Sequence, residues 1–134
     1  MSSIALIGGT GAVGRAIADV LREQGRSYRP IGRSDALLQN VFRNDSLAEL
    51  RTWNADAASA TSTLGGVESA VYLVGIPYDR FELHPKLMKA ALDGAVAAGV
   101  KRMLLVGTVY PYGSPRTRTV DETHPREPQA FNAK

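Results

Sequence analysis

The chain has 134 residues, of which 44% are hydrophobic and 22% charged, as expected for a single globular domain. No apolar run is long enough to span a bilayer, and the opening Met-Ser-Ser-Ile lacks the basic start of a signal peptide, so we expect no membrane contact. The small net charge of +3, spread along the chain, argues against a nucleic-acid partner, and the absence of cysteine argues against a thiolate metal site and favours a cytoplasmic protein without a metal.

Three short segments are apolar throughout, which is typical of parallel strands that helices cover on both faces. These segments are residues 4–7, 70–74 and 103–106. Weaker strand candidates lie at residues 27–31 and 49–54. Pro30 weakens the first of these, because proline has no N–H to donate to a sheet.

Helical patterns alternate with the strands. Apolar side chains recur at helical spacing over residues 13–21 and 87–98. Gly25 and Gly99 follow these segments as stop signals. We expect two shorter helices and then an irregular tail, at residues 35–42, 57–64 and 110–134.

This alternation predicts an α/β fold, a Rossmann-like doubly wound parallel sheet with the strand order 3-2-1-4-5. Residues 103–106 would then form an apolar edge strand, as if the sheet were truncated at its C-terminal side. Exposed apolar edges invite association. We therefore expect a second copy of the chain, or polypeptide beyond Lys134, to cover this edge.

A glycine-rich loop joins the first strand to the first helix as G-x-x-G-x-x-G. Glycine there permits a sharp turn, a close approach of the backbone to a pyrophosphate, and tight packing of helix on strand. The N-terminus of the helix then presents free N–H groups to the phosphates. A glycine-rich turn without a ligand is the alternative. The setting favours a dinucleotide-binding domain over residues 1–134, with cofactor contacts from Gly8, Thr10, Gly11, Ala12, Val13 and Gly14.

Arg33 stands at the end of the second strand, where an NAD site has an acidic residue that holds the ribose 2′-hydroxyl. An arginine at this point accommodates a 2′-phosphate, so we expect NADP, with NAD as the other possibility. Asp35, two residues after Arg33, either complicates the choice between NADP and NAD or caps a helix. An ordinary surface arginine is the alternative for Arg33.

With these residues placed, the chain resembles the extended or atypical short-chain dehydrogenase/reductases, the NAD-dependent epimerase/dehydratase family, over the N-terminal half of such a protein. "IGGTGAVG" is similar to the family opening TGxxGxxG, with Ile7 in place of the usual threonine. "NADA" at 54–57 is similar to the segment after the third strand, which implies that Asp56 and Ala57 contact the adenine. For Asp56, a helix N-cap is equally compatible.

The resemblance continues along the chain. "VYLVGI" at 71–76 is similar to the end of the fourth strand, which implies that Val74, Gly75 and Ile76 lie beside the riboses. "VKRMLLVGTVYPYG" at 100–113 resembles the fifth strand and its continuation, which places Thr108 as the catalytic Ser/Thr. A hydroxyl that only bonds nearby backbone is the alternative for Thr108.

The family's catalytic Tyr-x-x-x-Lys pair is absent. Phe131 and Asn132 occupy the place of the tyrosine, and Lys134 follows Phe131 by three residues instead of four. The resemblance implies an oxidoreductase or sugar-nucleotide epimerase/dehydratase that acts on a small-molecule substrate, with the substrate part outside this chain. The missing tyrosine motivates the alternative, a non-catalytic NADP-binding sensor or regulatory module.

Overall fold

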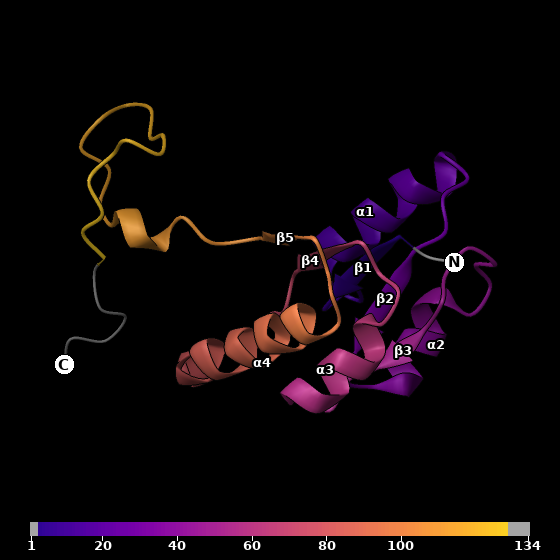
Figure 1. Ribbon diagram of the computed structural model, residues 1–134. Coiled ribbons are helices and arrows are strands. Elements are labelled where there is room, and N and C mark those ends of the chain that lie inside the picture. Colours follow the sequence, from indigo (N-terminus) through magenta and orange to yellow (C-terminus); the bar gives the residue numbers. More distant parts are fainter. Residues whose placement is uncertain (1–2, 129–134) are drawn as a thin grey trace.

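The computed structural model describes residues 3–128. Five parallel strands form one sheet in the order β3-β2-β1-β4-β5 (Figure 1). This order confirms the doubly wound, Rossmann-like α/β fold predicted from the alternation of apolar segments and helical patterns. The strands are β1 (Ile4–Ile7), β2 (Arg29–Gly32), β3 (Arg51–Thr52), β4 (Ser69–Tyr72) and β5 (Arg102–Leu105).

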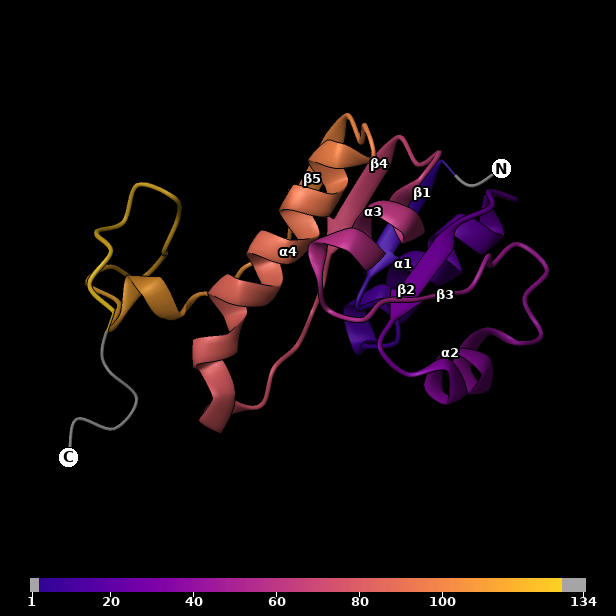
Figure 2. The same ribbon diagram turned by 60° about the horizontal axis from the view of Figure 1, so that its bottom comes forward.

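Helices cover both faces of the sheet (Figure 2). Side chains of α1 and α2 pack on one face, and those of α3 and α4 pack on the other. The bounds of the two short helices agree with the sequence prediction, and Ser34 and Asp56 cap them by accepting hydrogen bonds from Leu37 N–H and Ser59 N–H. The helices are α1 (Ala12–Glu23), α2 (Asp35–Phe42), α3 (Ala57–Leu64) and α4 (His84–Ala97), with 3₁₀ turns η1 (Tyr78–Leu83) and η2 (Tyr110–Tyr112).

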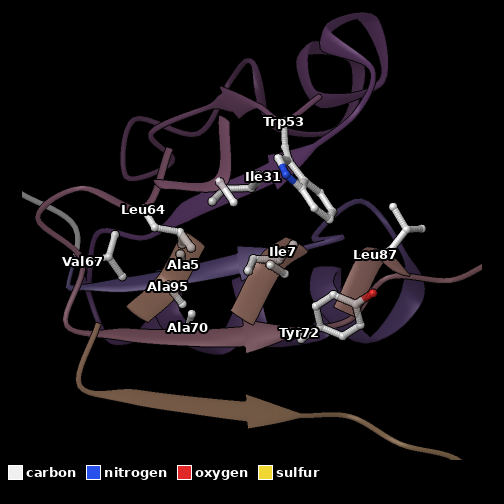
Figure 3. Packing of buried hydrophobic residues seen from close by; sticks show 12 residues of the cluster. Ala5, Ile7, Ile31, Trp53, Leu64, Val67, Ala70, Tyr72, Leu87 and Ala95 are labelled. Atoms are coloured by element: carbon white, nitrogen blue, oxygen red, sulfur yellow. The ribbon is translucent and has the colours of Figure 1, made fainter. Parts of the chain in front are cut away.

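Two apolar cores lie on the two sides of the sheet because successive strand residues point to opposite faces. Leu6 and Val71 face α1 and α2. Ile7 and Tyr72 are paired in register and face α3 and α4, and Figure 3 shows both side chains on this side of the sheet. On this second side Gly94 allows close helix contact, since a Cβ at Gly94 would lie 2.3 Å from the Cβ of Ala60.

Strand β3 is much shorter than the predicted segment 49–54, and Pro30 supplies a reason. Tyr28 N–H donates to Leu47 O, and Gly32 O accepts from Trp53 N–H, so alternate residues of β2 face the β3 chain. Pro30 lies between them with the same facing and has no N–H to donate. The ladder therefore forms only at Arg51–Thr52.

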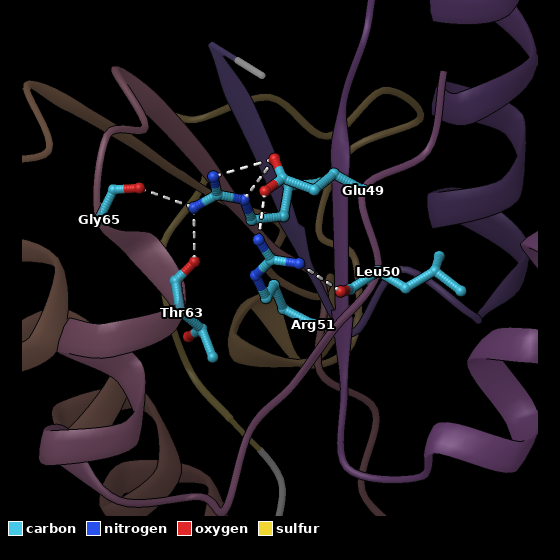
Figure 4. A network of polar contacts seen from close by, with 6 residues as sticks. Glu49, Leu50, Arg51, Thr63 and Gly65 are labelled. Carbon is cyan, nitrogen blue, oxygen red and sulfur yellow. Dashed lines mark hydrogen bonds and ion pairs between the residues drawn. The ribbon is translucent and has the colours of Figure 1, made fainter. Parts of the chain in front are cut away.

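A buried arginine ties β2 to the loops at the amino end of the sheet (Figure 4). The side chain of Arg29 is 7% exposed, forms an ion pair with Glu49 at 2.9 Å, and donates to the carbonyl oxygens of Thr63 and Gly65 at 2.8 Å each. Arg51 contacts the other oxygen of Glu49. The charges of Arg29, Arg51 and Glu49 thus pair with one another, at the opposite end of the sheet from the glycine loop.

The prediction that helices cover the fifth strand on both faces is wrong for residues 3–128. Met103 packs against the core on the α4 side, but Leu104 and Leu105 are 62% and 50% exposed. Within that range β5 pairs only with β4. The chain then leaves the sheet and folds on itself (Figure 1), where His124 Nε2 accepts a hydrogen bond from Arg116 N–H.

Two further findings hold for the described part of the chain. None of its helices combines the length and apolar character needed to cross a membrane. Its His, Asp and Glu side chains form no group of three or more that is placed to hold a metal ion.

Candidate functional site

A cavity of about 1140 Å³ opens at the carboxyl ends of the strands. Its wall is made by the glycine loop, by the residues that follow β2, β4 and β5, and by the start of α4. In open parallel sheets, ligands bind in this crevice where the strand order reverses. Here that point lies between β1 and β4, directly beside the glycine loop.

The loop needs glycine at two positions for reasons internal to the fold. Gly8 has a φ of +84°, and a Cβ there would lie 2.8 Å from the backbone of Leu73 and Val74. A Cβ on Gly14 would lie 2.4 Å from Gly9 O. These contacts fold the loop tightly against β4 and hold α1 close to β1, so Gly8 and Gly14 have structural roles whether or not a ligand is bound.

Gly11 differs from these two. It is the N-cap of α1, with φ −75° and ψ 176°, and a Cβ there would meet only Gly8 O at 3.7 Å. No side chain caps the helix and its first turn has no acidic residue, so within residues 3–128 its N–H groups face the cavity without a negative partner. Arg15 Nε donates to Thr10 O at 2.9 Å and holds the loop from outside. This arrangement can receive an anion.

Arg33 lines the cavity directly after β2 and is exposed. Among residues 3–128 it forms no ion pair, whereas Arg22, Arg29 and Arg51 all do. Asp35 is the first residue of α2, and Ser34 is its cap. Arg33 is therefore available to a ligand.

Asp56 and Ala57 do not line the cavity. The Asp56 carboxylate accepts from Ser59 N–H at 2.7 Å, and this bond holds the pKa of Asp56 below its ordinary value. The capping alternative thus describes Asp56 in this structure. Adenine contact by these two residues stays a prediction from the resemblance.

The predicted residues after β4 and β5 come together in the cavity wall. Val74, Gly75 and Ile76 leave the end of β4, and Thr108 follows β5. Thr108 Oγ1 accepts from Tyr110 N–H at 3.3 Å, so its own O–H proton remains for another acceptor. Phe131, Asn132 and Lys134, at the place of the family's catalytic pair, lie outside the described residues.

Several aromatic residues also line the wall. Tyr110 belongs to the segment 100–113 that carries the family resemblance, whereas Tyr78 was not singled out from the sequence. The hydroxyls of Tyr78 and Tyr110 lie 3.2 Å apart, and this hydrogen bond raises the pKa of Tyr110. Trp53 and Tyr72 lie in the segments 49–54 and 70–74, which were expected only as strands. Their one signal in the sequence is position, since each stands at the carboxyl end of a strand. Other missed wall residues are Phe81, His84 and Met88.

Comparison with solved structures places the fold. UDP-N-acetylglucosamine 4-epimerase from Bacillus cereus superposes with a TM-score of 0.78 at 17% identity, over 96% of this chain and 46% of that one. A short-chain dehydrogenase/reductase superfamily protein from Agrobacterium tumefaciens with bound NAD superposes with a TM-score of 0.72 at 26% identity. The match covers 95% of this chain and 39% of that one. NADPH-dependent quinone oxidoreductase from Escherichia coli, complexed with NADPH, superposes with a TM-score of 0.70 at 24% identity. The match covers 84% of this chain and 39% of that one.

The chain spans less than half the length of each of these proteins. No curated protein matches the sequence. The family model described as NAD(P)H-binding matches residues 8–131, which include the whole glycine loop and strands β2 to β5. The chain therefore belongs to the NAD(P)H-binding family and has the fold of the epimerases and short-chain dehydrogenase/reductases.

Proposed function

We propose that the cavity binds NADP, with the pyrophosphate at the N-terminus of α1 and the adenosine 2′-phosphate at Arg33. The observation that carries the choice of NADP is the guanidinium of Arg33, which lines the cavity and forms no ion pair with any residue of the described range 3–128. A 2′-phosphate supplies the anion that this arginine lacks, and such charge-assisted bonds are among the stronger polar contacts. The similar structures with bound NAD and NADPH support a pyridine dinucleotide without choosing between them.

The dissociation constants of NADPH and NADH on wild type and on Arg33→Ala test this assignment. We expect a loss of roughly 10- to 150-fold for NADPH, as for one charged hydrogen bond, and less than a twofold change for NADH. Arg43→Ala is the matched control, because Arg43 is an exposed arginine at the C-cap of the same helix, α2, away from the cavity. Equal losses for both cofactors on Arg33→Ala would refute the choice of NADP.

We further propose that the protein is an oxidoreductase or a sugar-nucleotide epimerase/dehydratase acting on a small carbonyl or hydroxyl compound. The bound nicotinamide would supply or accept hydride. Thr108 is the candidate catalytic residue, because its free O–H can donate to a substrate oxygen in the cavity. Val74, Gly75 and Ile76 would border the riboses.

Absorbance at 340 nm tests for catalysis. Oxidation of NADPH by carbonyl substrates that is lost in Thr108→Ala supports the enzyme. Tight binding of NADPH without turnover across a broad substrate panel favours the second candidate, a non-catalytic NADP-binding sensor. The observation that favours the sensor is the Phe131 that stands in the sequence where the family has its tyrosine.

A further inference from the structure

Tyr72 places a polar group among apolar side chains at the floor of the cavity. It is the last residue of β4, paired in register with Ile7 of β1, and it faces α3 and α4. It is 2% exposed, and it lines the cavity. Figure 3 shows its hydroxyl directed toward Leu87 of α4, at the carboxyl end of the strands.

The Tyr72 hydroxyl lacks a hydrogen-bond partner in the described part of the chain. Two other buried aromatic residues differ from it, because the Tyr28 hydroxyl bonds Asp45 and the Trp53 indole donates to Asp56 O at 3.0 Å. A buried polar group without a partner costs free energy, so native proteins satisfy nearly all of them. Burial raises the pKa of Tyr72, which keeps the phenol protonated and therefore a donor.

Tyr72 and Arg33 line the same cavity. The positive charge of Arg33 acts on Tyr72 and offsets part of the rise in its pKa. Trp53 connects the two residues, because its N–H donates to Gly32 O, directly before Arg33, and its side chain belongs to the same core cluster as Tyr72. The proposed 2′-phosphate site and the Tyr72 hydroxyl thus belong to the same cavity and are linked through Trp53.

We propose that the Tyr72 hydroxyl donates a hydrogen bond to the adenosine half of the bound dinucleotide and selects for ligands that carry adenine. The inference rests on the proposed function, that the cavity takes a pyridine dinucleotide. The shielded oxygen requires a covering side chain to shift on binding. Met88, partly buried on α4 and part of the same wall, is unbranched and flexible enough to do so.

Tyr72→Phe removes the hydroxyl and leaves the ring. If the hydroxyl is unpartnered in the free protein, the melting temperature of the free variant stays equal to that of wild type or rises. Its affinity for NADPH and for ADP-ribose falls roughly 3- to 10-fold, as for one hydrogen bond. Its affinity for reduced nicotinamide mononucleotide, which has no adenosine, stays the same.

Tyr28→Phe is the matched control, since it removes a bonded hydroxyl on the opposite core. We expect it to lower the melting temperature and to leave NADPH affinity unchanged. A Tyr72→Phe protein that binds ADP-ribose as tightly as wild type overturns the inference. A lower melting temperature of the free variant also overturns it, because it would mean that a buried water satisfies the hydroxyl in the free protein. A wild-type protein that binds no dinucleotide overturns the proposed function itself.

Discussion

Gly11→Ala separates a glycine that the fold needs from one that a ligand needs. The backbone at Gly11, with φ −75° and ψ 176°, is open to alanine, and the nearest atom to the new methyl is Gly8 O at 3.7 Å. Alanine gains about 0.4–1 kcal/mol by restricting the unfolded chain. It is also the poorer N-cap, by about the same amount. We therefore expect the free energy of unfolding to stay within about 0.5 kcal/mol of wild type.

Affinity has a different expectation. The methyl group would stand at the N-terminus of α1, where the pyrophosphate must approach the N–H groups. Loss of one charge-assisted hydrogen bond costs about 1.5–3 kcal/mol. Since about 1.4 kcal/mol is tenfold in affinity, calorimetric titration with NADPH should show a loss of roughly 10- to 150-fold.

Gly65→Ala is the matched control. Gly65 also has a permissive backbone (φ −55°) and room for a methyl, since the nearest atom is Ser62 O at 3.6 Å, and it lies outside the cavity. We expect it to leave NADPH affinity unchanged. A Gly11→Ala protein that binds NADPH as tightly as wild type, with the same stability, refutes the argument that close phosphate approach requires glycine here.

Two predictions concern stability. Gly94→Ala drives a methyl into Ala60 of α3 and should lower the free energy of unfolding by about 1–3 kcal/mol in urea titration, whereas Gly65→Ala has no such clash; an unchanged midpoint would contradict the close helix contact. Asp56→Ala removes the cap of α3 and should lower the melting temperature at pH 7. Because folding lowers the pKa of Asp56, this difference in melting temperature is fully present above the unfolded pKa of about 3.9 and fades as the pH falls through the folded value. Asp56→Asn, which still caps the helix, should show little of this difference. A pH-independent difference for Asp56→Ala would refute the carboxylate's role.

Most of the fold was predictable because its strands and helices depend on residues that are close together in the chain. The alternation of apolar strands and helical periodicity gave the strand order, and the bounds of α2 and α3 follow from Ser34 and Asp56 as N-caps. The segment 49–54 was less readable. Its pairing depends on Pro30, which is far away in sequence, so the length of β3 is decided by a neighbouring strand.

The residues of the candidate site were also predictable only in part. The glycine loop and Arg33 were readable because one strand–turn–helix unit brings them together through short-range backbone constraints. Asp56, by contrast, satisfies a local cap outside the cavity wall.

By itself the sequence determined the parallel α/β topology, the turn of the glycine loop and the cation after β2, since each depends on residues close together in the chain. Only the tertiary structure decided which glycines have no room for a side chain. It also decided that, within residues 3–128, β5 stays exposed and the Tyr72 hydroxyl is buried without a partner in the cavity that Arg33 lines. The physical reason is that burial, clash and unmet hydrogen bonds are properties of neighbours in space. Neighbouring strands of this sheet are separated by tens of residues along the chain.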